Sequence, residues 1–247
     1  MTDQASAEAP RTGGWREIWA GRRLDPQRGS VLAQLLAADG FDTGFGDVIE
    51  ENWVAYVRGW AAELGLGPGT SVFEVGCGSG AFLYELRRLG CSVAGLDQSE
   101  SLVAVARSVL PDAAFSVADA AGVPTEPQAD VVISVGVFCY FPSLDYAEKV
   151  IERMAAKAGR AVLLVDLPDL ARRGAALAHR VATVGGPDAY AARYEDLDHL
   201  YFARDWVADK LRSVGFDEVH TADQDLADYS NAAFRFNAWG RRAGAVG

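Results

Sequence analysis

Short apolar runs alternate with amphipathic stretches through the middle of the chain, and this alternation limits the possible folds more than any other feature. Strand following helix in regular order predicts a parallel sheet that is covered by helices on both faces. The runs predict strands near residues 71–76, 92–96, 114–118, 130–135 and 160–166, and helices near 80–89, 99–109 and 143–157.

The last third of the chain departs from this alternation. The pattern of residues 167–198 is typical of helix and loop around a Gly-Gly-Pro sequence and does not lead directly to another strand. It predicts an insertion over the carboxyl edge of the sheet. A helix near 203–214 precedes two strands near 216–224 and 231–240, and the absence of a helix between them predicts antiparallel neighbours. We therefore expect an α/β, doubly wound, mostly parallel seven-stranded sheet with an antiparallel last strand.

The residues before the first strand predict helices that do not belong to the sheet. Two short helical pieces are separated near Asp25-Pro26, and Asp47 is placed to cap a longer amphipathic helix. The predicted organisation is a disordered lead-in at 1–13, an N-terminal helical lid at 14–46, a core at 47–166, a helical cap insertion at 167–198, and the end of the core at 199–247.

Composition excludes several classes of partner. The 247 residues carry a formal net charge of −11, which argues against nucleic acid, anionic membranes and strongly anionic acceptors, because polyanions are bound through clusters of Lys and Arg. Three separated cysteines give no zinc-site spacing, so we expect no metal. Met1–Gly14 lacks the pattern of a signal peptide, and we expect a cytoplasmic protein.

The strongest local motif is Val72–Gly80, which reads Val-Phe-Glu-Val-Gly-Cys-Gly-Ser-Gly. Glycines at 76, 78 and 80 allow a tight turn between a strand and a helix and a close approach of a ligand. The same spacing satisfies the loose fingerprint of dinucleotide-binding loops, so the glycines alone do not identify the ligand. Glu74 favours a different ligand, because a carboxylate beside this loop suits an ammonium and a sulfonium better than a pyrophosphate.

A second acidic residue, Asp97, ends the next strand and is followed by Gln98. A carboxylate in this place can accept hydrogen bonds from both hydroxyls of a ribose. Nicotinamide-dependent oxidoreductases also bind ribose with an acidic residue in this place, so Asp97 predicts a nucleoside ligand but does not identify it.

The acidic-x-Gly-x-Gly-x-Gly motif resembles the first motif of class I S-adenosylmethionine (SAM)-dependent methyltransferases. The resemblance extends from Trp53 to Trp239, and residues 129–138 are similar to the fourth motif of that family. It implies a Rossmann-like fold, SAM as cofactor, S-adenosylhomocysteine (SAH) as product and in-line methyl transfer. The residues expected to bind the cofactor are Glu74, Gly76, Gly78, Gly80, Asp97, Gln98, Asp119, Ala120, Ser134, Gly136, Tyr56 and Trp53.

Aromatic and polar residues beyond these motifs are candidates for contact with the acceptor. His199 could act as a general base, or could simply hold the cap on the sheet. Tyr140 could orient the acceptor or close the core, and Asp166 could contact a cationic acceptor or cap a helix. One of four aromatic residues on the N-terminal helices could contact the donor, or core packing alone could explain them: Trp15, Trp19, Trp53 and Tyr56. We predict His199 and Tyr140 as catalytic residues, and Phe138, Tyr140, Tyr201 and Asp166 as residues that bind the acceptor.

The acidic composition, the lid and the insertion predict a closed pocket for a small-molecule acceptor. The resemblance points to an oxygen or nitrogen of a natural-product or sugar intermediate. Two rivals remain: a nicotinamide-dependent oxidoreductase, and a non-catalytic module that binds SAM. The sequence does not decide whether the protein forms a homodimer.

Overall fold

A computed structural model describes residues 13–41, 48–194 and 197–244. The predicted lead-in, apart from its last residue, and the predicted cap Asp47 lie outside the described residues. The helix that Asp47 was expected to cap begins at Glu50, with Ile49 at its N-cap position and no side-chain hydrogen bond from that residue.

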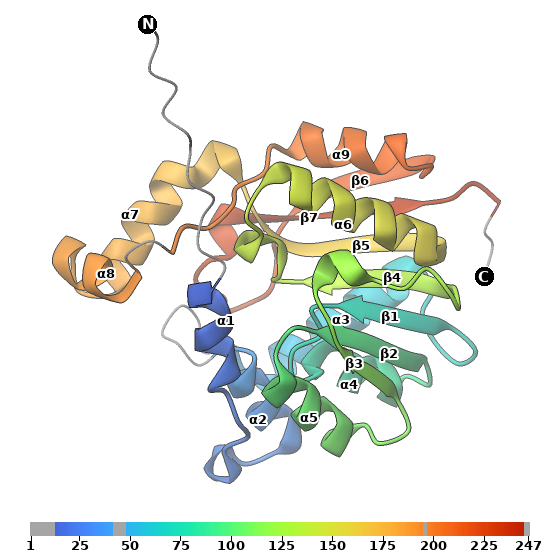
Figure 1. The fold of residues 1–247 in the computed structure, drawn as a ribbon, viewed down its shortest axis with the longest axis horizontal. Coiled ribbons are helices and arrows are strands. Elements are labelled where there is room, and N and C mark those ends of the chain that lie inside the picture. The colour runs from blue at the N-terminus through green and yellow to red at the C-terminus, as the bar shows by residue number, and fades with distance from the viewer. Residues whose placement is uncertain (1–12, 42–47, 195–196, 245–247) are drawn as a thin grey trace, which may run out of the picture.

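The described residues form one seven-stranded sheet in the order β3-β2-β1-β4-β5-β7-β6 (Figure 1). Strands β1 to β5 pair in parallel, whereas β7 is antiparallel to both β5 and β6. This arrangement confirms the predicted fold class. The strands are β1 (Ser71–Val75), β2 (Ser92–Asp97), β3 (Ala114–Val117), β4 (Ala129–Val135), β5 (Ala158–Pro168), β6 (Glu218–Asp223) and β7 (Arg235–Arg241).

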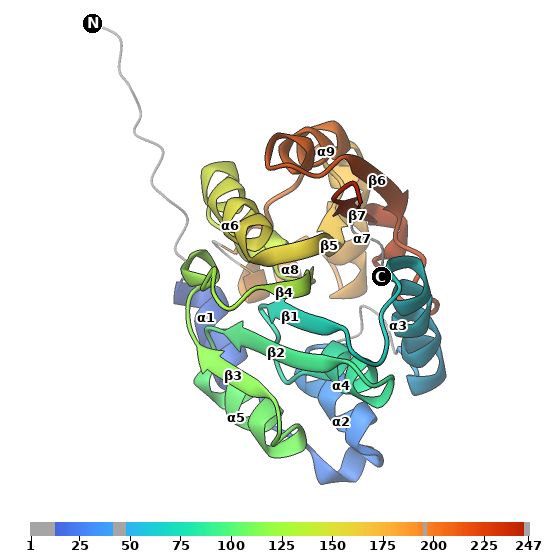
Figure 2. The same ribbon diagram turned by 90° about the vertical axis from the view of Figure 1, so that its right-hand side faces the viewer.

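Helices cover both faces of the sheet, as an end-on view shows (Figure 2). Alternate residues of the buried strands serve two separate apolar cores: Val72 and Val131 belong to one, and their neighbours Phe73 and Val132 to the other. This is why these strands are apolar almost throughout. The first core packs under α2 (Val31–Ala38), α3 (Glu50–Leu64), α4 (Ala81–Arg88) and α5 (Glu100–Val109), and the second under α6 (Leu144–Lys157) and α9 (Arg204–Ser213).

Two helical segments lie beyond the carboxyl edge of the sheet. Helix α1 (Gly13–Ala20) and the short η1 (Pro26–Arg28) precede α2. After β5, the turn η4 (Leu170–Arg172) leads into α7 (Arg173–Thr183) and α8 (Pro187–Tyr194), which extend away from the sheet (Figure 1). The remaining short turns are η2 (Ala120–Gly122), η3 (Phe138–Tyr140) and η5 (Ala232–Phe234).

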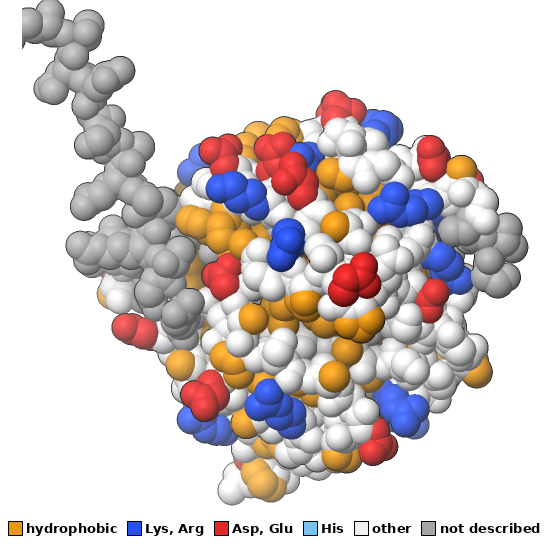
Figure 3. Space-filling model, turned by 45° about the vertical axis from the view of Figure 1, so that its right-hand side comes forward, with side chains coloured by type: hydrophobic (Ala, Val, Ile, Leu, Met, Phe, Trp, Pro, Cys, Tyr) orange, Lys and Arg blue, Asp and Glu red, His pale blue; other side chains and the backbone are white. Residues whose placement is uncertain are grey.

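The chain leaves β1 toward β2 on one side and later returns to β4 on the other. This reversal opens a crevice at the carboxyl ends of β1 and β4, and such a switch point is where open α/β sheets bind ligands. Within the described residues, no helix is both long and apolar enough to cross a membrane. On the face in Figure 3, basic and acidic side chains are interspersed and form no continuous basic surface.

Candidate functional site

The glycine loop after β1 takes a conformation that only glycine fits. Gly76 and Gly78 have positive φ angles of 73° and 52°. A Cβ at Gly76 would lie 2.3 Å from Cγ2 of Val137, and one at Gly78 would lie 2.4 Å from Oδ1 of Asp39. The loop therefore brings bare backbone to the edge of the crevice.

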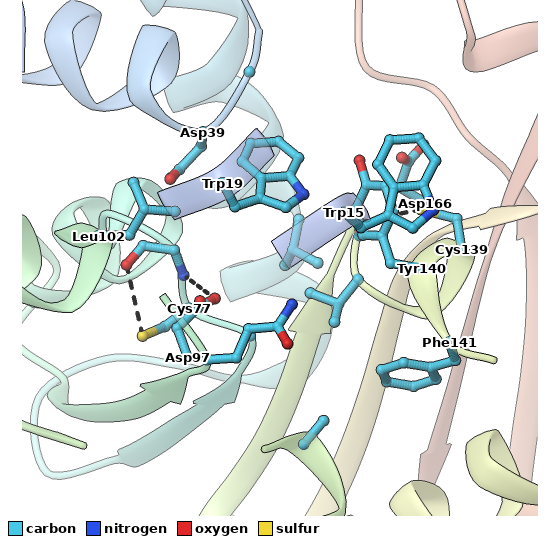
Figure 4. Close-up of a pocket in the computed structure, with 18 of the residues that line it drawn as sticks. Trp15, Trp19, Asp39, Cys77, Asp97, Leu102, Cys139, Tyr140, Phe141 and Asp166 are labelled. Carbon is cyan, nitrogen blue, oxygen red and sulfur yellow. Dashed lines mark hydrogen bonds between the residues drawn. The ribbon is translucent and has the colours of Figure 1, made fainter. Parts of the chain in front are cut away.

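A cavity of about 620 Å³ occupies this crevice, within the usual range for small-molecule sites. In Figure 4, Asp39, Cys77 and Asp97 lie on one side and Tyr140 and Asp166 on the other, with Trp19 between them in the view. The predicted site residues that line the cavity are Trp53, Glu74, Gly76, Gly78, Asp97, Gln98, Asp119, Ala120, Gly136, Tyr140, Asp166 and His199.

One end of the cavity is acidic. The Asp97 carboxylate accepts hydrogen bonds from the backbone N–H groups of Gly78 at 3.0 Å and Ser99 at 2.7 Å. Glu74 is 2% exposed, and its buried Oε2 has no hydrogen-bond partner among the described residues. Burial raises the pKa of Glu74 well above its usual range, and repulsion from Asp39 and Asp97 adds to this effect. A cationic ligand would relieve these costs.

Asp39 also belongs to this acidic end, and no sequence motif predicts it. It follows α2, and its carboxylate accepts hydrogen bonds from the backbone N–H of Ser79 at 2.7 Å and, at 3.4 Å, from that of Ala81. Burial raises its pKa to about 7. Asp39 thus caps the start of α4, where a dinucleotide-binding protein holds the pyrophosphate. Together with Glu74, this carboxylate argues against the oxidoreductase.

Aromatic rings of α1 also line the cavity, and Trp15 lies opposite the acidic end (Figure 4). The ring centroid of Trp15 lies 4.8 Å from that of Tyr140 and 5.1 Å from that of His199. Trp19 packs edge-on against Tyr140 at 5.7 Å. The predicted lid therefore contacts the cavity through Trp15 and Trp19, two residues that the sequence had already marked as candidates.

Asp166 lines the opposite end of the cavity but already has partners. Its Oδ2 accepts a hydrogen bond from the Tyr229 hydroxyl at 3.0 Å and lies 3.7 Å from Nη1 of the buried Arg235. These partners compete with a cationic acceptor for the carboxylate, and contact between Asp166 and the acceptor stays a prediction. The neighbouring Asp169 caps η4 and pairs with Arg204 at 2.8 Å.

His199 contacts Arg180 of the cap, with Nη1 of the arginine 3.0 Å from Nδ1 of the imidazole. A guanidinium can only donate, so Nδ1 must accept, and the proton of the neutral ring then lies on Nε2. Burial, followed by repulsion from Arg180 and Arg235, holds the pKa of His199 well below its usual range. This state does not favour the predicted role of general base.

Five predicted site residues lie outside the lining of the cavity: Gly80, Ser134, Phe138, Tyr56 and Tyr201. Gly80 has a φ of 89° and begins α4, facing α5 rather than the cavity. The Ser134 hydroxyl donates to the carbonyl of Val75 at 2.9 Å within the sheet. Gly80 thus belongs to the start of a helix and Ser134 to the pairing of two strands, and neither lines the cavity.

The three aromatic residues of this group also have other surroundings. Phe138 is 2% exposed and packs in the second core against Phe141, at 4.6 Å between centroids. Tyr56 lines a separate cavity between α3 and the β6–β7 strands. The guanidinium of Arg173 lies over Tyr201. Strand and helix periodicity cannot distinguish these orientations, because an aromatic residue suits a core and a ligand pocket equally well.

Comparison with known proteins identifies the family of the chain. Residues 73–163 match the family described as "Methyltransferase domain". The chain is 30% identical over 193 residues to the nocamycin O-methyltransferase of Saccharothrix syringae, covering 70% of this chain and 68% of that relative. The chain belongs to the SAM-dependent methyltransferases. This confirms the family resemblance and, with it, SAM as the cofactor.

Other methyltransferases extend the comparison. The trans-aconitate 2-methyltransferase of Rhizobium etli is 32% identical over 139 residues, which are 55% of this chain, and the chain spans 48% of that relative's length. The SAM-bound crystal structure of magnesium protoporphyrin IX methyltransferase from Synechocystis superposes with a TM-score of 0.64 at 18% identity, covering 97% of this chain and 100% of that one. This likeness supports the fold.

Proposed function

We propose that this methyltransferase transfers the methyl group of SAM to an oxygen or nitrogen of a small-molecule acceptor, a natural-product or sugar intermediate. One observation carries the proposal: a single cavity joins the acidic end at Glu74 and Asp97 to an aromatic end at Trp15 and Tyr140. Two relatives are named nocamycin O-methyltransferase and trans-aconitate 2-methyltransferase, and these names support a small-molecule acceptor.

The acidic end would hold the cofactor. Oε2 of Glu74, which has no hydrogen-bond partner among the described residues, would accept from the ammonium group, and Asp97, which lines the same cavity, would accept from the ribose hydroxyls. Asp119 already accepts hydrogen bonds from the Tyr146 hydroxyl and, at 2.9 Å, from the backbone N–H of Ala121. These contacts hold its carboxylate in the lining of the cavity, where it would accept from the adenine amino group.

The aromatic end would orient the acceptor and exclude water. SAM supplies a methyl group that is activated by its sulfonium. Alignment of the acceptor with that methyl group is therefore the main task of the protein, and positioning can supply much of the barrier reduction. Trp15, Trp19 and Tyr140 form the walls that would hold the acceptor in line. Because Nε2 of His199 already carries a proton and Nδ1 accepts from Arg180, His199 would not remove the proton of the acceptor atom.

The proposal is tested with SAM carrying a labelled methyl group, incubated with the protein and with fractions of small-molecule extracts. We expect label in an organic product together with release of SAH, and loss of both in Glu74→Gln. Tight binding of SAH without transfer to any fraction would instead favour the non-catalytic binding module.

A further inference from the structure

Arg180 of α7 is a buried cation at the acceptor end of the cavity. It is 6% exposed and lines the cavity. Its guanidinium contacts Nδ1 of His199 at 3.0 Å and lies over the rings of Tyr190 and Tyr194, 5.3 and 5.2 Å from their centroids. All three partners are neutral, and Arg180 forms no ion pair with any carboxylate of the described residues.

Arg235 provides an internal comparison. It is equally buried and lines the same cavity, but Asp166 lies 3.7 Å away and offsets its charge. Asp166 offsets the charge of Arg235, whereas no carboxylate of the described residues offsets the charge of Arg180. A buried charge without a counterion is unfavourable, so an anion supplied by a ligand would stabilise this end of the cavity.

His199 adds a second donor beside Arg180. Its Nδ1 accepts from the guanidinium, which leaves a proton on Nε2, and the ring lines the cavity. A planar guanidinium matches the two oxygens of a carboxylate, and a neutral N–H donor adds a hydrogen bond without adding charge. The excess of one positive charge suits a singly charged anion better than a doubly charged phosphate.

We propose that the acceptor carries a carboxylate, which binds to Arg180 with the Nε2–H of His199 as a second donor. This inference rests on the proposed function, since it names the chemical class of the acceptor. The cofactor cation would bind at the acidic end and the acceptor anion at the other. The net charge of −11 argues against strongly anionic acceptors, but it describes the whole chain and does not exclude one carboxylate beside one buried arginine.

The test uses the protein saturated with SAH, titrated by calorimetry and ligand-observed NMR with acetate, benzoate and phenylacetate. Benzamide is the neutral counterpart of benzoate with the same shape. We expect at least one carboxylate to bind, and benzoate to bind at least tenfold more tightly than benzamide. In Arg180→Gln the affinity for the bound carboxylate should fall at least tenfold, while the affinity for SAH stays within threefold of the wild type.

Arg173→Gln is the matched control. Arg173 lies on the same helix, but its guanidinium stacks on Tyr201 away from the cavity, so this variant should keep carboxylate binding. Equal carboxylate affinity in Arg180→Gln and the wild type would overturn the inference, as would binding of none of the three carboxylates. If Arg180→Gln does not fold, the wild type alone tests the inference: tighter binding of benzoate than of benzamide would support it, and equal binding would overturn it. Failure of the wild type to bind SAH would instead contradict the proposed function itself.

Discussion

The carboxylate of Asp39 accepts a hydrogen bond from the backbone N–H of Ser79 at 2.7 Å, across 40 residues of sequence. This contact joins the end of α2 to the glycine loop and to the start of α4. It places a carboxyl group where a helix N-terminus would otherwise receive an anionic ligand. The Asp39 carboxyl group at the cofactor end of the cavity is therefore held by hydrogen bonds from the glycine loop and the start of α4.

Asp39→Ala should destabilise the fold and weaken cofactor binding. The variant removes the acceptor at the start of α4, and loss of such a cap costs about 0.5–2 kcal/mol. Thermal unfolding and calorimetric titration with SAH measure the two effects. Asp39→Asn keeps an acceptor oxygen and should lose less of both. Equal unfolding temperatures and equal SAH affinities for Asp39→Ala and the wild type would show that the contact is not needed.

The same residue predicts a pH dependence of stability. The pKa of Asp39 is about 7 in the folded chain against an ordinary value of 3.8, because burial disfavours the charged form. Between these values the folded state holds a proton that the unfolded state has released. The contribution of Asp39 to stability is therefore present below about pH 4 and is lost as the pH rises through 7.

Asp39→Asn isolates this contribution, because the other titrating groups are shared with the wild type. The unfolding temperature of the variant minus that of the wild type should increase from pH 5 to pH 8 at constant ionic strength. Differential scanning calorimetry at four pH values measures this difference. A constant difference would mean that Asp39 ionises normally in the folded protein.

Glu74→Gln should separate stability from cofactor binding. Glu74 is buried, and its Oε2 has no partner in the described part of the chain, so a neutral amide of the same shape should leave the unfolding temperature unchanged or raise it. Loss of a hydrogen bond to a charged group costs about 1.5–3 kcal/mol, so the affinity for SAM should fall roughly tenfold or more. Glu100→Gln, at an exposed position at the start of α5, is the control. Unchanged SAM affinity in Glu74→Gln would remove Glu74 from the site.

Two glycine substitutions should have opposite effects. Gly76→Ala combines a φ of 73° with a Cβ 2.3 Å from Val137, and a left-handed conformation alone costs an alanine about 1–2 kcal/mol. We expect a lower unfolding temperature and loss of SAH binding. Gly59→Ala adds a methyl group with nothing within 4 Å in the interior of α3 and should stabilise by roughly 0.5–1 kcal/mol. A stable Gly76→Ala that binds SAH would contradict the account of the loop.

Much of the fold and the cofactor end could be predicted because their signals are local. Glu74, Gly76 and Gly78 lie within five consecutive residues, and Asp97 ends the next strand, where parallel strands must bring it to the same edge. Asp39 could not be predicted in this way. Its partners Ser79 and Ala81 are more than 35 residues away, and a lone aspartate after a helix is typical of many ordinary surface positions.

The acceptor end was predicted less well because its residues come from separate elements. Arg180 lies in α7 and Arg235 begins β7, and nothing in the spacing shows that they share a cavity with His199. The role expected of His199 assumed an isolated imidazole near its ordinary pKa. The contact with Arg180 changes both the proton position and the pKa, and only the tertiary structure supplies that partner.

The central claim is that the glycine loop with its acidic neighbours binds SAM and not a nicotinamide dinucleotide. Calorimetric titration with SAH, in parallel with NADH, tests it most directly, and Asp97→Ala serves as the site variant. We expect micromolar binding of SAH, no binding of NADH, and a loss of at least tenfold in SAH affinity in the variant. Binding of NADH in preference to SAH, or SAH affinity that is unchanged in Asp97→Ala, would contradict the account.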